Sequence, residues 1–138
     1  MTALRERVRA ALDPFVALRS PTSETNGDGS LGFDYGAVPF ALQVVSLADG
    51  LDVISVTGVL AWDLALDDAT RSRVGTAADA VQFGSVHLIE RETDADVILR
   101  YSFPATGLED TALTTMLLLV LDGAAGARNA VARTAESS

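Results

Sequence analysis

The sequence contains no cysteine and no lysine, and it has a single histidine, His87. Without cysteine neither a disulfide framework nor a thiolate metal site can form, and one histidine is a poor basis for a zinc site. We therefore expect no cofactor and no metal. The lack of disulfides is typical of proteins in a reducing compartment, so we expect the protein to be cytoplasmic.

The charge balance is strongly acidic. All ten basic residues are arginine, 19 residues are acidic, and the formal net charge is −9. Nucleic acids and anionic membranes are bound through clustered Lys and Arg, so this balance argues against both as partners. It favours either solubility alone or a partner with a basic surface.

Long apolar segments are also missing. Residues 2–18 carry Glu6 and Asp13 and lack the apolar core of a secretory signal. The most apolar run, Met116–Leu121, is about half a membrane span even when it is extended back to Leu113, and Asp122 ends it. We expect neither export by such a signal nor insertion into a membrane.

The length and composition predict one domain over residues 1–138. Hydrophobic residues make up 49% of the 138 residues, which is enough for a buried core without staples. Polar and turn-forming residues fill the stretch from Ser20 to Ser30, so a flexible linker is expected at about 20–31. The tail at about 134–138 is expected to fray.

Periodicity in the first half predicts a helix followed by strands. Apolar residues recur at helical spacing from Leu4 to Phe15, with Pro14 ending or kinking the helix. Alternation predicts a short strand at 32–35, a strand at 38–44 and a long strand at 54–66, the last two joined by a turn at Asp49-Gly50. Trp62 shares its parity with Ile54 and Leu60 on the apolar face, and Gly58 is a candidate for a bulge.

The second half predicts a helix, a hairpin and a final helix. Asp67-Asp68 can cap a helix that runs to about Val81. Strands at 86–89 and 97–103 flank a charged turn, and Thr106 with Glu109 fits a capping box before a very apolar helix. Such a helix would be buried on more than one side. A second subunit is a candidate for covering the additional side.

Patterns that would indicate catalysis fail on inspection. Ser85 and His87 share a strand face but lie about 6–7 Å apart, too far for a nucleophile and its base. A calcium-loop pattern beginning at Glu24 has Tyr35 where the last carboxylate is required. Phosphate-binding and hydrolase motifs are absent, and the GxxG at Gly123 lies within a predicted helix of an acidic protein.

A family resemblance lies in the second half. The run from Gln82 to Leu88, the strand Val97–Phe103, then Gly107-Leu108 and the apolar helix ending near Ala127-Arg128 resemble the type III secretion chaperone-like group, which includes YbjN-like and CesT-type proteins. The resemblance covers about residues 4–131. It implies an α+β fold with an antiparallel sheet flanked by helices in the order α-β-β-β-α-β-β-α, and a small homodimer without cofactor or catalysis.

The resulting hypothesis is a non-catalytic protein-binding module, a homodimeric chaperone-like or regulatory protein that holds a segment of an unidentified partner. Candidate contact residues are Val59, Trp62, Met116 and Leu118. One alternative is a small-ligand or metal-binding protein or enzyme with an acidic site near Glu90–Asp96. Another is a domain that works only within a complex.

Overall fold

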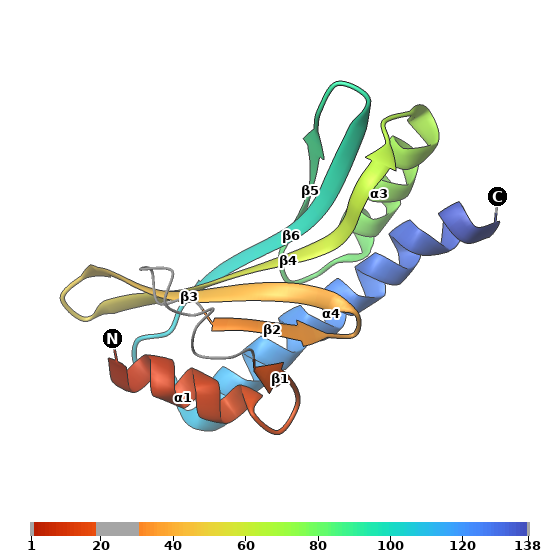
Figure 1. Cartoon of the computed structure of the whole chain (residues 1–138). Helices are drawn as coiled ribbons and strands as arrows, with labels where there is room; N and C mark the ends of the chain where they lie inside the picture. The colour runs from red at the N-terminus through yellow and green to blue at the C-terminus, as the bar shows by residue number, and fades with distance from the viewer. Residues whose placement is uncertain (1, 19–30, 138) are drawn as a thin grey trace.

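A six-stranded antiparallel sheet with helices packed on one face makes up the molecule (Figure 1). The computed structural model describes residues 2–18 and 31–137. Its elements in chain order are α1 (Thr2–Leu12), β1 (Ala17–Leu18), β2 (Leu31–Tyr35), β3 (Val38–Ala48), β4 (Leu51–Ala65), α3 (Asp68–Ala80), β5 (Ser85–Glu90), β6 (Asp94–Pro104) and α4 (Asp110–Ser137).

The predicted order of elements is confirmed, with one addition. The two-residue strand β1, which the sequence did not predict, pairs with β2 at one edge of the sheet. The spatial order is β1-β2-β3-β4-β6-β5, so β6 lies between β4 and β5. Most of the predicted linker lies outside the described residues, and Leu31 already belongs to β2.

One face of the sheet forms the core together with the helices. Side chains alternate regularly over residues 38–44 of β3 and 54–60 of β4, so that Phe40 and Val56 are buried while their neighbours point the other way. Helix α4 crosses behind β3 and β4 and contacts both α1 and α3 (Figure 1). Its buried stripe, which includes Leu113, Leu117 and Leu121, has the spacing of a helix with one core face.

Gly58 lies in regular pairing, so its interpretation as a bulge is wrong. It is opposite Phe40 on β3 and Leu99 on β6 without a break in register. A Cβ atom at Gly58 would lie 2.6 Å from Cε1 of Phe40, closer than such atoms approach. The glycine is therefore explained by the close approach of the Phe40 ring, which stacks on Phe33.

The capping box predicted before the last helix is also wrong. The Thr106 hydroxyl accepts a hydrogen bond from the backbone N–H of Asp52, at 2.8 Å, and so ties the β6–α4 connection to the start of β4. Helix α4 begins at Asp110, and its first helical hydrogen bond runs from the Leu113 N–H to the Glu109 carbonyl. Position and composition suggested a cap, but a tertiary contact takes the hydroxyl.

The cap of α3 is confirmed. The carboxylate of Asp67 accepts a hydrogen bond from the Thr70 N–H at 2.8 Å, and this bond lowers the pKa of Asp67. The helix ends at Ala80, with Val81 in extended conformation as its C-cap.

Helix α4 is longer than the apolar run alone suggested. Its segment Asp110–Val131 has 22 residues and contains an 18-residue window with a mean hydropathy of 1.2, so length and composition alone would allow it to cross a membrane. In this structure the same segment supplies a large part of the core. The predicted absence of a membrane partner stays a prediction, as does the fraying of residues 134–138, although the helix is continuous through Ser137.

Candidate protein-binding face

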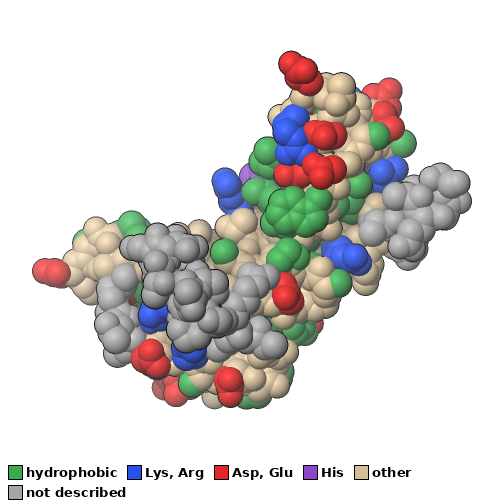
Figure 2. All heavy atoms as spheres, viewed as in Figure 1, with side chains coloured by type: hydrophobic (Ala, Val, Ile, Leu, Met, Phe, Trp, Pro, Cys, Tyr) green, Lys and Arg blue, Asp and Glu red, His purple; other side chains and the backbone are tan. Residues whose placement is uncertain are grey.

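None of the helices within residues 2–18 and 31–137 packs on the second face of the sheet. Residues on this open face alternate with the core residues along β3, β4, β6 and β5, and most of them are half-buried or exposed. Figure 2 shows this side of the molecule, with hydrophobic side chains gathered over β4 and β6. An antiparallel sheet with one solvated face usually carries polar residues there, so apolar side chains on it require an explanation.

Cross-strand pairing sorts the open face into rows. His87, Ile98 and Val59 are direct neighbours across β5, β6 and β4. Towards the β3–β4 turn the rows become polar, and the Ser102 hydroxyl donates a hydrogen bond to Oγ of Ser55 at 3.2 Å. The apolar side chains therefore concentrate where the β5–β6 hairpin meets the end of β4. We define the open-face patch as Val59, Trp62, Ile89 and Ile98.

Trp62 is the most exposed member of this patch, with 61% of its surface accessible. The register of β4 against β6 shifts between Val59 and Ala61 and again between Ala61 and Leu64. Each shift inserts an extra residue and changes which face the following side chains occupy. Trp62 therefore leaves the core face that it shares by parity with Leu60. The prediction that it lies on the buried side of the strand is wrong for this physical reason.

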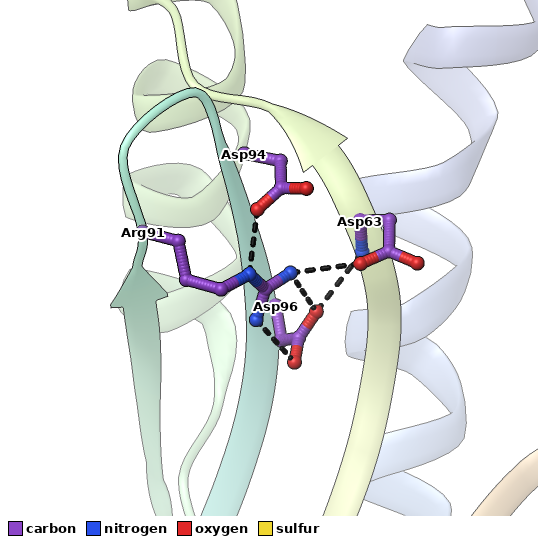
Figure 3. Close-up of polar contacts among 4 residues, drawn as sticks. All are labelled: Asp63, Arg91, Asp94 and Asp96. Carbon is purple, nitrogen blue, oxygen red and sulfur yellow. Dashed lines mark hydrogen bonds and ion pairs between the residues drawn. The ribbon is translucent and has the colours of Figure 1, made fainter.

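The side chain of Arg91 links the ends of β4 and β6 next to the open-face patch. The Arg91 guanidinium, in the turn after β5, contacts three carboxylates (Figure 3). Its Nε lies 2.6 Å from Oδ1 of Asp94, and Nη2 lies 2.8 Å from Oδ1 of Asp63. Nη1 and Nη2 each donate to Asp96 at 2.9 Å, in a bidentate pair. We refer to Asp63, Arg91, Asp94 and Asp96 as the Arg91 bracket.

The bracket also fixes the second register shift of β4. Asp63 has a positive φ of 52°, which is uncommon for a residue other than glycine but is best tolerated by Asn and Asp. Its backbone N–H donates to Oδ1 of Asp96 at 2.9 Å, so the same carboxylate binds both the guanidinium and the irregular backbone. These bonds hold the strand end at which Trp62 is turned outward.

The electrostatics of the bracket follow from these contacts. Hydrogen bonds from Arg91 and from the Asp63 N–H lower the pKa of Asp96 to about 2. The hydrogen bonds that Arg91 donates to Asp96 and to Asp94 raise the pKa of Arg91. Both shifts favour the charged forms of Asp96 and Arg91, which hold each other in place through the bidentate pair.

The acidic cluster near Glu90–Asp96 is thus largely occupied by arginine. Arg91 takes Asp94 and Asp96, and the Glu90 carboxylate lies 3.3 Å from Nη2 of Arg71 on α3. Within residues 2–18 and 31–137, no group of three or more His, Asp or Glu side chains is arranged to hold a metal ion. The arrangement supports a structural role for these carboxylates.

The four predicted contact residues fall into two places. Val59 and Trp62 lie together on the open face. Met116 and Leu118 lie on α4, on the helix side of the sheet, where Met116 packs partly against the core. The structure therefore does not bring the four together. The sequence analysis missed Ile89, Ile98 and the bracket, although an Asp directly after a strand tryptophan is a usable signal for an irregular strand end.

Comparisons with known proteins show the fold. No family model and no curated protein matches the sequence. Among solved structures the chain is similar to the crystal structure of YbjN, described as a proposed transcription regulator from E. coli. The TM-score is 0.56 at 8% identity, and the match covers 96% of this chain and 92% of that one. This chain therefore has the fold of YbjN, with the α+β element order that the resemblance implied.

Proposed function

We propose, from this YbjN-like fold, that the domain is a non-catalytic binding module that acts as a homodimer and holds an apolar segment of a partner protein on its open-face patch. The observation that carries the proposal is Trp62, which is 61% exposed on the same sheet face as the paired Val59 and Ile98, a face that no helix of the described residues covers. Tryptophan in an apolar setting is the residue type most enriched at interface hot spots.

The surroundings of the patch fit a polar rim around an apolar centre. The Arg91 bracket borders it on one side and supplies fixed charges, three acidic and one basic. With a net charge of −9, the whole chain attracts a basic partner segment and speeds its encounter. A chaperone-like or regulatory role is the kind of function that such a surface can perform without catalysis.

The test uses two exposed apolar residues of the open side. Trp62→Ala removes the centre of the patch, and Leu47→Ala, at the far β3–β4 hairpin where Leu47 is 64% exposed, is the matched control. In pull-downs from native cell extract, we expect the same proteins with the wild type and Leu47→Ala, and their loss with Trp62→Ala. An unchanged set of proteins with Trp62→Ala would show that the patch is not the binding surface.

Light scattering tests the homodimer separately. The chain has a mass of 14.4 kDa, so a dimer gives twice that value. Stable dimers bury about 1,200–2,000 Å² and persist at about micromolar concentration. A strict monomer at that concentration would refute the dimer and leave the binding role of the patch to the pull-down.

A further inference from the structure

A groove between α3 and α4 lies on the helix side of the sheet, away from the open-face patch. The two helices contact each other and run side by side in Figure 1. The cavity has a volume of about 390 Å³, within the range of small-molecule sites. Its walls come from the end of α3, from the connection to β5 at Val81 and Phe83, and from Leu119 on α4.

The wall of the cavity that α4 forms contains two glycines, so it has few side-chain atoms. Gly123 and Gly126 line the cavity, and neither has the positive φ that would require glycine. A Cβ atom at either position would meet nothing within 4 Å, so no contact inside the domain requires glycine either. Each costs about 1 kcal/mol relative to alanine in a helix. Gly75 on α3 is equally unconstrained but does not line this cavity, so the cavity and not glycine alone marks the site.

The charges that border the groove favour a positively charged ligand. Among the described residues that line it, Asp122 is the one ionisable residue, and the Tyr35 hydroxyl donates to Oδ1 of Asp122 and fixes the carboxylate. The C-terminal end of α3, at Ala80, also borders the groove. The last carbonyls of a helix have no partner within the helix and carry partial negative charge. The Asp122 carboxylate and the C-terminal end of α3 therefore both place negative charge beside the groove.

We propose that this groove binds a small cationic amphiphile, with one aromatic or alkyl body and an ammonium or amidinium group. The body lies against Phe83, Leu119 and the bare backbone at Gly126. The cation lies between the Asp122 carboxylate and the end of α3. The site is distinct from the open-face patch, so it gives the domain a ligand-responsive surface on the opposite side from its proposed protein partner.

The test is an NMR titration of the full chain with 4-phenylbutylammonium, with 4-phenylbutyrate as the matched anion. We expect saturable shifts at the amides of 119–130 with the cation only. Asp122→Asn keeps an acceptor for Tyr35 and should weaken binding about fivefold, as loss of an exposed ion pair does. Gly126→Leu should abolish it by filling the groove. Gly75→Leu and Trp62→Ala should leave the affinity unchanged.

The dependence of binding on salt concentration tests the contribution of the Asp122 charge without a variant. Raising NaCl to about 0.5 M should weaken the cation's binding, because it screens an exposed carboxylate. Equal binding of the anion, or undiminished binding by Gly126→Leu, would overturn the proposal. So would concentration-dependent shifts at 119–130 without ligand that Gly126→Leu removes, because these would assign the groove to a second copy of the chain.

Discussion

The two faces of this sheet are built from the same strands but differ in the burial of their side chains and in the regularity of their pairing. On the covered face, Phe40, Val56 and Leu99 lie on the three neighbouring strands β3, β4 and β6 and are buried in the core. On the open face, Ile98 is only 9% exposed, whereas Trp62 is 61% exposed and is turned there by an irregular strand end. Regular alternation thus supplies the buried core, and departure from it exposes the apolar side chain that we propose as the centre of a binding surface.

Truncation on the covered side should have the largest effect. Leu117 on α4 is 1% exposed, and Leu117→Ala should lower the free energy of unfolding by about 2–5 kcal/mol, because it removes buried methyl groups and leaves a cavity. Urea denaturation measures this. Leu119→Ala, two residues along the same helix, should cost less than about 1 kcal/mol because Leu119 is 39% exposed. Similar losses for the two variants would contradict the assignment of the core face.

The next effect concerns the close approach within the sheet. Gly58→Ala would place a methyl group 2.6 Å from the buried Phe40 ring, and should lower the free energy of unfolding by about 1–3 kcal/mol. Gly75→Ala, on the exposed side of α3, meets no atom and should raise it by up to about 1 kcal/mol. The same denaturation series measures both signs. A stabilising Gly58→Ala would show that the Phe40 ring can move aside.

The Arg91 bracket predicts a dependence on pH. Asp96 has a pKa of about 2 in the folded chain, below its unfolded value of about 3.9. A lowered carboxyl pKa stabilises the folded state above the unfolded pKa, and this contribution is lost as pH falls from about 4 through about 2. Asp96→Asn should therefore destabilise the protein at neutral pH and flatten the acid side of the stability profile. Urea midpoints between about pH 5 and pH 2 measure it, with Asp110→Asn, in the ion pair with Arg7, as a control elsewhere.

The smallest effect on stability should come from the patch itself. Trp62→Ala should change the free energy of unfolding by about 0.5 kcal/mol or less, because the indole is mostly exposed. A loss of several kcal/mol would mean that Trp62 is a core residue and would remove the contrast between the two faces. Intrinsic fluorescence offers a direct reading, since Trp62 is the single tryptophan and should emit as a solvated indole.

Local patterns in the sequence were sufficient for the elements and their order. The alternation around Val38–Val44 and the helical spacing of Leu4 and Val8 reflect burial alone. These apolar residues are buried in the structure, as their patterns predicted. The errors lie where distant residues compete for the same group. The Thr106 hydroxyl is taken by Asp52, 54 positions away, and the carboxylate of Asp96 holds the irregular backbone at Asp63. No local window contains both partners of such a contact.

The candidate site was predictable only in part for the same reason. Val59 and Trp62 could be named because their residue types favour interfaces, and the structure places them on one surface. Ile98 and Ile89 could not, because their neighbourhood depends on β6 lying between β4 and β5. Met116 and Leu118 were chosen for their apolar character, and the long helix uses such residues to fill the core as well as to face outward.

The position of β6 also affects how the chain emerges during synthesis. Strand β4 is 15 residues long, and its later neighbour β6 begins only after α3 and β5 have been made. Until then β4 has one free edge rich in apolar residues, which is a template for pairing between nascent chains. Translation at about 5–20 residues per second leaves this edge uncovered for a few seconds. Chains released early, before Asp94, should therefore aggregate, whereas complete chains close the edge themselves.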